Sequence, residues 1–492
     1  MHSSCTRLTV AAFLYALLTV SGIALASAWA HGPGQHDDDR YVGSQSGSKQ
    51  PSDGSATIIT PESAEFVRLS VQALIGSDEE RAKALDFFVK RGELDIVPTL
   101  VLIAQVGGGH KLVLKAINDL TGASITNWRE AMLWQEANPQ IVPHPSYVSL
   151  KLRHFANIDA AFMDYFRPDF MAPERMKIRF EEITWGGVKA DGISPLDRPK
   201  MIAAEDADYL LDDDLVFGVA INGDVRAYPL RIMGWHEMLN DVIGGVPVAL
   251  AYCTLCGSGI LFVTATEGRK EPLIFGSSGL LYRSNKLMFD RGTNSLWNQF
   301  TGRPVIGPLA QTTLALKIRP LAITSWKLWK AKHPSSEVLS LETGFYRNYD
   351  SGVVYRDYFA SPELLFPTIV GDESVAKRKD YVFGVRAFGA ARAWPLVAFE
   401  GQSVINDRIG STALVLIGNP ATRTVRAYRR EAGEHFEGTS EKELTGPGGA
   451  WRVSEDFLVG PSGEKRPRIA GHIAYWFAWD GYLGAESTLY AK

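Results

Sequence analysis

The chain contains two similar stretches of about forty residues, one beginning at Val216 and the other at Val382. Aligned without gaps, 166 residues apart, both contain an Arg-Ala-aromatic-Pro motif and an Asn-Asp-x-Ile-Gly motif, so that Asn240 matches Asn406. Internal similarity of this kind indicates a repeated structural unit. We therefore expect two copies of one unit, packed as a pseudo-symmetric pair.

The residues inside the repeat are typical of short β-strands. Apolar runs such as Val216–Ile221 and Val246–Tyr252 are separated by turn residues, and Asn222-Gly223 is a strong hairpin signal. We expect a first β-rich unit over residues 181–345 and a degenerate second copy over residues 346–492. Asp241 recurs as Asp407, so we expect it to hold turn geometry rather than to act as a catalytic acid.

The two copies differ at the residues best suited to chemistry. The first copy has His, Glu, Cys and Cys where the second has Gln, Ser, Asn and Thr; the pairs are His236/Gln402, Glu237/Ser403, Cys253/Asn419 and Cys256/Thr422. Ligand types lost together from one copy are expected to serve one site.

Cys253 and Cys256 form a Cys-x-x-Cys-Gly motif between two apolar runs, which is typical of a metal-binding knuckle. A redox dithiol usually opens a helix, and Gly257-Ser258-Gly259 does not favour one here. His236 is the best third ligand, and a Cys₂His set leaves one position open. We predict a site for a transition metal (zinc, copper or iron) at His236, Cys253 and Cys256.

Two other interpretations of the cysteines remain open: a thiol–disulfide redox pair, and a structural disulfide beside a core histidine. The catalytic residues are not identified by the sequence. Second-rank candidates for the same cleft are Glu237, Ser278, Arg283 and Asp290.

The first thirty residues predict export. Arg7 precedes an apolar run from Leu8 to Leu25, and Ala28-Trp29-Ala30 offers small residues for cleavage, as in a secretory signal peptide. We expect a periplasmic or secreted protein with no membrane span after cleavage. Residues 31–59 are rich in Gly, Ser, Asp and His and predict a disordered leader.

Residues 60–138 have helical periodicity. Thr60-Pro61 and the capping box of Ser77-Asp78-Glu79-Glu80 begin helices, and Gly92 ends one. Short helices with tight turns predict a HEAT-like module that could dock a protein partner. Residues 139–180, rich in proline and aromatic residues, are expected to be a connector. The whole is an α+β chain.

Charge gives little support to a nucleic-acid partner. The chain has 51 basic and 55 acidic residues, only 22% of its residues are charged, and no basic stripe is present. Cys5 leaves with the signal, so the mature chain keeps only the Cys253–Cys256 pair and is not a disulfide scaffold.

Several blocks resemble a known family. The segments DGISPLDRPK, RAYPLRIMGWHEMLND, AYCTLCGSGILF, GLLYRSNKLMFDRGTNSLWNQFTG and TSWKLWKAKHP, from about Asp191 to about Leu341, are similar to domain of unknown function 3179 (DUF3179). The family's usual Cys-Pro-Leu-Cys-Gly has Thr254 in place of proline here. The resemblance implies the domain and no particular chemistry.

These observations give one leading hypothesis and two alternatives. The leading one is an exported metal-binding protein, either a metal-dependent or a redox enzyme acting on a small molecule. The alternatives are a thiol–disulfide redox protein using the Cys-x-x-Cys pair, and a non-catalytic metal carrier or interaction scaffold.

Overall fold

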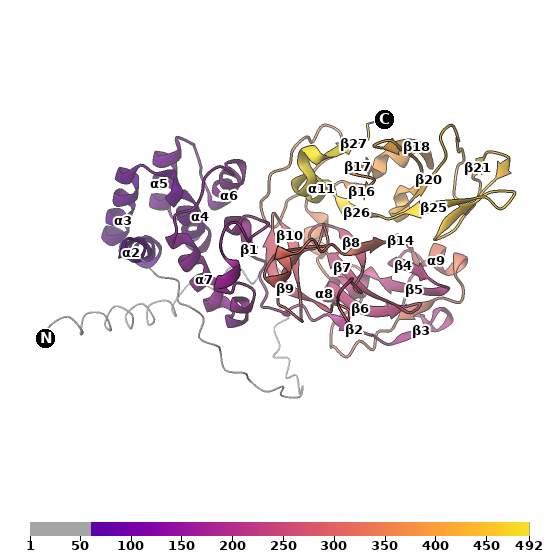
Figure 1. Cartoon of the computed structure of the whole chain (residues 1–492), viewed down its shortest axis with the longest axis horizontal. Coiled ribbons are helices and arrows are strands. Elements are labelled where there is room, and N and C mark those ends of the chain that lie inside the picture. Colours follow the sequence, from indigo (N-terminus) through magenta and orange to yellow (C-terminus); the bar gives the residue numbers. More distant parts are fainter. Residues whose placement is uncertain (1–60, 492) are drawn as a thin grey trace. The chain divides into compact units, whose positions relative to one another are not determined.

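A computed structural model describes residues 61–491 (Figure 1). Contacts divide the chain into a unit ending at Ala190 and a unit beginning at Asp191. The first is helical and the second is built mainly of strands, so the α+β fold class is confirmed. The predicted signal peptide and leader lie outside the described residues.

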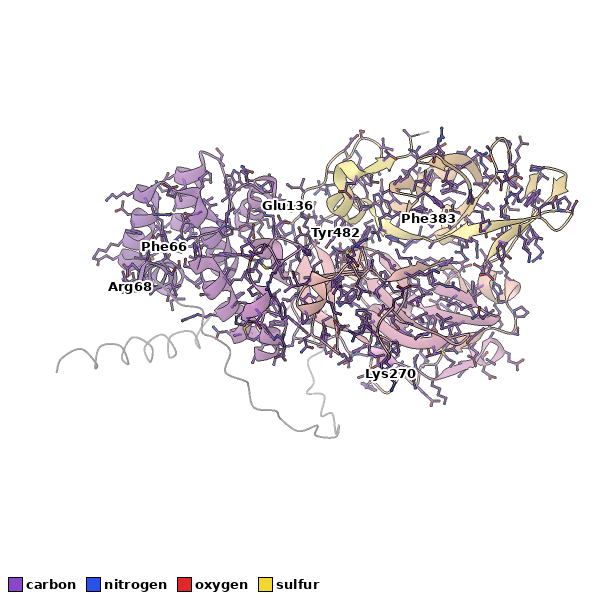
Figure 2. The ribbon with its side chains drawn as sticks, in the orientation of Figure 1. Phe66, Arg68, Glu136, Lys270, Phe383 and Tyr482 are labelled. Atoms are coloured by element: carbon purple, nitrogen blue, oxygen red, sulfur yellow. A yellow bond between two sulfur atoms is a disulfide. The ribbon has the colours of Figure 1, made fainter. Side chains whose placement is uncertain are left out.

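The first unit consists of antiparallel helices joined by short turns. They are α2 (Pro61–Ile75), α3 (Asp78–Arg91), α4 (Val97–Val106), α5 (Lys111–Thr121), α6 (Trp128–Ala137) and α7 (Ser146–Ile158). The predicted capping box is present at α3, where Ser77 and Glu80 each accept from the other's backbone N–H, and Gly92 ends the helix in the left-handed conformation. Phe66 (Figure 2) stacks on His144 at 3.9 Å between ring centres.

Helix α7 lies inside the stretch expected to be a connector. Tyr147, Leu150 and Phe155 are buried, and the helix contacts α2 and α4. The prolines that indicated a connector stand outside the helix: Pro145 precedes it, and Pro168 begins a later 3₁₀ turn, η3 (Pro168–Phe170). Strand β1 (Ile183–Trp185) follows. No helix among residues 61–491 is long and apolar enough to cross a membrane.

The second unit begins with the first copy of the repeat. Its elements are β2 (Leu196–Asp197), β3 (Met201–Ala203), β4 (Leu215–Ile221), β5 (Asp224–Pro229), α8 (Leu230–His236), β6 (Met238–Ile243), β7 (Val246–Cys253), β8 (Ser258–Val263), β9 (Phe275–Tyr282), β10 (Asn285–Asp290), β11 (Leu296–Asn298), β12 (Arg303–Ile306), β13 (Lys317–Arg319), β14 (Ala322–Ser325), α9 (Trp326–Lys332) and β15 (Glu337–Leu339). Two sheets have the orders β14-β4-β5-β15-β3 and β13-β8-β7-β6-β2, and β9 to β12 form a meander.

The second copy follows helix α10 (Arg356–Ala360). Its elements are β16 (Tyr381–Ala387), β17 (Ala390–Pro395), η7 (Leu396–Phe399), β18 (Val404–Ile409), β19 (Thr412–Asn419), η8 (Pro420–Thr422), β20 (Thr424–Arg429), β21 (Thr445–Gly446), β22 (Gly449–Ala450), β23 (Arg452–Val453), β24 (Phe457–Val459), β25 (Lys465–Ile469), β26 (Gly471–Tyr475), α11 (Trp476–Leu483) and β27 (Ser487–Leu489). Its sheets have the orders β26-β16-β17-β27 and β18-β19-β20-β25-β24-β23.

The two copies share strand order and register. In the first copy β14 pairs with β4 so that Ile323 opposes Phe217; in the second β26 pairs with β16 so that Ile473 opposes Phe383. Each pair of strands is completed by a parallel strand, β15 on β5 and β27 on β17. The structural repeat therefore continues past the forty residues of sequence similarity.

Matching close approaches explain two repeated glycines. A Cβ atom on Gly218 would lie 2.2 Å from the ring of Trp329, and one on Gly384 would lie 1.9 Å from the ring of Trp479. Both tryptophans are fully buried. Only glycine leaves room for the helix that each copy packs on its sheet.

The copies share one core. Strand β8 of the first contacts β26 of the second, and β20 of the second, which stands where β8 does, contacts β14 of the first. One continuous buried cluster contains Phe217 and Leu239 from the first copy and Phe383 and Ile405 from the second. These reciprocal contacts are those of a pseudo-two-fold pair.

Candidate functional site

The two cysteines lie at the turn that joins β7 to β8. The backbone N–H groups of Cys256 and Gly257 donate to the carbonyl oxygens of Cys253 and Thr254, each at 3.2 Å. The sulfur atoms are at disulfide distance, with Cα atoms 5.2 Å apart, and both side chains are buried. The motif is therefore a turn between strands, as predicted, and does not open a helix.

Gly257 is needed directly after the second cysteine. Its φ is +60°, and a Cβ atom there would lie 2.9 Å from the ring of Tyr381. The equivalent residue of the second copy, Arg423, has a φ of +52°. The backbone of this turn is thus shared by both copies, while the cysteines belong to one.

His236 ends α8 and is buried, and both of its ring nitrogens have protein partners. Nδ1 lies 2.8 Å from the carbonyl oxygen of Ser194, and Nε2 lies 2.6 Å from the hydroxyl of Tyr349. Burial lowers the pKa of His236 to about 4, so the imidazole is neutral at pH 7.

A metal site does not follow from this arrangement. Among residues 61–491 no three His, Cys, Asp or Glu side chains are grouped so that they could hold a metal ion. The predicted Cys₂His site stays a prediction.

Glu237 forms a buried ion pair with Lys286 and also binds the cysteine turn. One carboxylate oxygen accepts from the hydroxyls of Thr254 at 2.7 Å and Tyr355 at 3.2 Å, and the other lies 3.1 Å from Nζ of Lys286. The side chains of Glu237 and Lys286 are only 8% and 4% exposed. Burial lowers the pKa of Lys286, and the Glu237 carboxylate opposes that shift.

The tip of the β9–β10 hairpin lies against the second cysteine. Arg283 and Ser284 occupy the turn with φ values of +48° and +62°, where glycine or asparagine is usual. The carbonyl oxygen of Ser284 is 3.6 Å from Sγ of Cys256. The hydroxyl of Ser284 and both amide atoms of Asn285 are buried, with no hydrogen-bond partner in the described chain.

Strain and unpaired polar groups therefore meet at one place. Glu237 and Tyr355 also have positive φ values, +56° and +55°, so several of the strained non-glycine residues surround the cysteine turn. Such residues are stable only where the surrounding structure holds them, and they are frequent at functional sites. This concentration marks the Cys253–Cys256 turn as the candidate site.

Tyrosines from the segment between the copies and from the second copy cover the turn. The hydroxyl of Tyr358 donates to the carbonyl oxygen of Leu255 at 2.7 Å. The backbone N–H of Tyr475 donates to the carbonyl oxygen of Cys256, also at 2.7 Å. Lys379 lies 3.7 Å from the centre of the Tyr358 ring, and burial lowers its pKa to about 8.

Sequence reasoning missed Lys286, Tyr355 and the covering tyrosines. Lys286 had a usable signal, since this lysine stands directly before the apolar run Leu287–Phe289 in a strand. The tyrosines had none, because they come from segments at least a hundred residues away along the chain.

The remaining second-rank candidates have mixed surroundings. Ser278 donates to the carbonyl oxygen of Leu287 at 2.5 Å, within the β9–β10 hairpin. Asp290 accepts from Thr293 and, at 3.0 Å, from Trp297, so its contacts are those of a turn. Arg283 stands at the hairpin tip and donates to the carbonyl oxygen of Gly481 at 3.1 Å.

Asp241 has structural contacts that its counterpart repeats. Its carboxylate binds Arg226 and Tyr228, each at 2.8 Å. Asp407 binds Arg392 and Trp394 at the same distance. The same structural role recurs in both copies, but it is not in a turn: each aspartate lies inside a strand, β6 or β18, and binds side chains of β5 or β17.

Comparison with known proteins identifies the second unit. No curated protein and no solved structure matches the chain. A family model described as "Protein of unknown function (DUF3179)" matches residues 190–486, more than half of the chain. The chain therefore belongs to the DUF3179 family.

Proposed function

We propose that this protein is an exported thiol–disulfide redox protein whose Cys253–Cys256 pair exchanges with a substrate disulfide. The observation that carries the proposal is the placement of the pair: two cysteines at bonding distance, on a turn enclosed by strained residues and joined to a buried acid. The signal-like first thirty residues support export. An exported protein works in an oxidising compartment, where disulfides form and exchange.

The reaction is a two-step exchange. The thiolate of one cysteine attacks a sulfur of the substrate disulfide; a mixed disulfide forms, the substrate S–S bond breaks, and the leaving thiolate takes up a proton. The second cysteine, as thiolate, attacks the first, which forms the Cys253–Cys256 bond and releases the second substrate thiol. One dithiol and one disulfide thus become one disulfide and two thiols.

Glu237 is the buried acid that holds the cysteine turn in place. Its carboxylate is buried, touches the turn through Thr254, and is held by Lys286 and Tyr355. These contacts fix Thr254, which lies between the two cysteines, so Glu237 positions the turn that carries both of them.

Access to the sulfurs requires a movement. Both cysteines are buried, and the Arg283–Ser284 tip lies on Cys256. The tip holds two residues in an unfavourable backbone conformation and two unpaired polar side chains. Moving it relieves strain and gives those groups water as a partner, so the tip is the element that opens.

The test is the rate at which the reduced protein reduces the disulfides of a protein substrate. We expect activity in the wild type, loss of it in Cys253→Ser and in Cys256→Ser, and unchanged activity in Asn419→Ser and Thr422→Ser, which alter the equivalent turn of the second copy. Metal content is measured on the same samples, purified without chelators.

Two results would overturn the proposal. One is a wild type as inactive as its cysteine variants. The other is a metal ion bound one to one by the wild type and lost from both Cys253→Ser and His236→Ala, which would restore the Cys₂His site.

A further inference from the structure

The outer edges of β6 and β18, which are equivalent strands, differ. In the first copy β2 adds to β6 as a parallel edge strand, with Leu196 opposite Leu239 and Asp197 opposite Asn240. In the second copy β18 is the last strand of its sheet, and no described strand pairs with its outer edge. The second copy therefore leaves open a position that the first copy fills.

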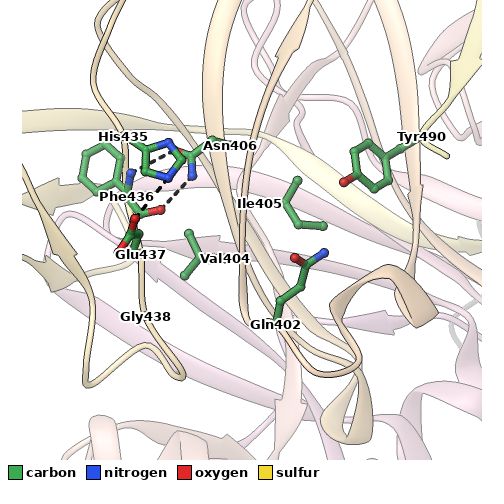
Figure 3. A pocket seen from close by; sticks show the side chains of 9 residues that line it. All are labelled: Gln402, Val404, Ile405, Asn406, His435, Phe436, Glu437, Gly438 and Tyr490. Carbon is green, nitrogen blue, oxygen red and sulfur yellow. Dashed lines mark hydrogen bonds and ion pairs between the residues drawn. The ribbon is translucent and has the colours of Figure 1, made fainter. Parts of the chain in front are cut away.

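A pocket lies along that open edge (Figure 3). It has a volume of about 370 Å³ and is lined by Val404, Ile405 and Asn406 of β18, by the segment His435–Gly438, and by Gln402 and Tyr490. Residues 238–241 of β6 are all buried, whereas Val404, Asn406 and Asp407 are half-buried. The missing edge strand accounts for this difference.

The side-chain amide of Asn406, at this edge, has one N–H without an acceptor in the described chain. The side-chain amide of Asn240 accepts a hydrogen bond from the N–H of Phe275 and donates one to its carbonyl oxygen, both at 2.9 Å. It donates a further bond to the carboxylate of Asp197 at 2.7 Å. Asn406 brackets the backbone of Phe436 in the same way. No second acceptor for the Asn406 amide is found in the described chain, and the position of Asp197 is empty beside it.

The backbone of Asn406 is also directed outward. In the first copy the N–H of Arg198 donates to the carbonyl oxygen of Asn240 at 2.8 Å. Because the N–H and C=O of one strand residue point to the same side, the matching register on β18 leaves the N–H and C=O of Asn406 facing the pocket.

The geometry points to a peptide-binding site at the β18 edge, which takes an extended segment as an added parallel strand. The segment has an apolar residue that packs over Ile405 and, directly after it, an aspartate that accepts from the Asn406 amide. Main-chain hydrogen bonds to Asn406 fix the register, as in other cases of strand addition. This site is separate from the cysteine turn and does not depend on its chemistry.

The probe is a labelled peptide with the sequence of residues 192–200, GISPLDRPK, which contains the strand that fills this position in the first copy. Binding to the full chain is measured by fluorescence anisotropy. Three altered peptides accompany it: one with the leucine replaced by glutamate, one methylated on the arginine backbone nitrogen, and one methylated on the aspartate backbone nitrogen.

We expect saturable binding of the parent peptide and about tenfold weaker binding after methylation at arginine, whose N–H faces β18. Methylation at aspartate, whose N–H faces away, leaves the affinity unchanged, and the glutamate peptide does not bind. Hydrogen exchange should show protection of the Asn406 amide. Asn406→Asp keeps the acceptor for the N–H of Phe436, gives up the donor to its carbonyl oxygen, and repels the peptide aspartate. It should weaken peptide binding, and a melting temperature within a few degrees of the wild type shows that the variant is still folded.

The proposal is wrong if the parent peptide does not saturate, or if the two methylated peptides bind alike. It is equally wrong if protection appears on β6, which would mean that the peptide displaces β2, or if the chain alone protects β18 by pairing two copies edge to edge.

Discussion

The two copies of the repeat share strand order and register but differ in chemistry. The turn after β7 and the turn after β19 both place a residue with positive φ at the same position, yet one carries two cysteines and the other an asparagine and a threonine. The first copy also has β2 on the edge of β6 and Tyr349 on His236, whereas no described strand pairs with the outer edge of β18. The comparison separates what the fold requires from what the first copy has added.

The repeated glycines that pack against tryptophan rings, Gly218 and Gly384, should lose similar amounts of stability when they are replaced. Alanine at Gly218 or at Gly384 forces a methyl group into the ring of Trp329 or Trp479, at 2.2 and 1.9 Å. We expect each change to lower the free energy of unfolding by about 3 kcal/mol, the upper part of the range for overpacked cores. Chemical denaturation of both variants measures this.

A large cost at one position and none at the other would contradict a shared frame. Gly389→Ala in the β16–β17 turn is a useful reference, because no atom lies within 4 Å of a Cβ there and its cost comes from the backbone alone.

His236 should make the first copy sensitive to acid. Its pKa is about 4 in the folded protein because of burial, and about 6.5 in an unfolded chain. Between these values the unfolded state binds more protons, so stability falls as the pH falls from about 6.5 to about 4. We expect the wild type to lose about 2 to 3 kcal/mol more than His236→Gln over that interval.

The measurement is urea unfolding of both proteins at several pH values. Other buried histidines, such as His472, also contribute, so only the difference between the two proteins is diagnostic. Gln402→His, which puts the ring at the half-buried equivalent position, should leave the pH dependence close to that of the wild type. Equal pH dependence of the wild type and His236→Gln would show that the imidazole is accessible to water.

The hairpin tip at Cys256 should hold strain that serves exchange. Ser284→Gly relieves a φ of +62°, and we expect about 1 kcal/mol of added stability together with about fivefold slower reduction of a substrate disulfide. The matched control is Phe388→Gly, which relieves a φ of +56° at the β16–β17 turn of the second copy. It should stabilise by a similar amount and leave the rate unchanged.

If both glycine variants reduce the substrate at the wild-type rate, the tip does not gate the cysteines. If Ser284→Gly destabilises the protein, the tip carries no strain.

The parts of the fold that depend on neighbouring residues could be predicted from the sequence. The capping box of Ser77 and Glu80, the hairpin turn at Asn222, and the strands on either side of the cysteines follow from residues close together in the chain. The repeat was visible in the sequence because both copies need the same turn residues and the same asparagine, Asn240 or Asn406, to hydrogen-bond a neighbouring backbone segment.

The site itself depended on long-range packing and was only partly accessible. Cys253, Cys256 and Glu237 were selected because the second copy lacks them. That His236 faces Ser194 and Tyr349 could not be read from its own sequence, since those partners are 42 and 113 residues away. Lys286 and Tyr355 reach Glu237 over similar separations.

The central claim is that the Cys253–Cys256 pair is a reversible redox centre of the folded protein. The most direct measurement is a redox titration, in which thiols are trapped and counted by mass spectrometry across buffers of defined potential while circular dichroism follows folding. We predict two thiols appearing together, with a midpoint above about −300 mV, in protein that stays folded. A pair that stays oxidised in strongly reducing buffer until the protein unfolds would contradict the account and make the bond a structural one.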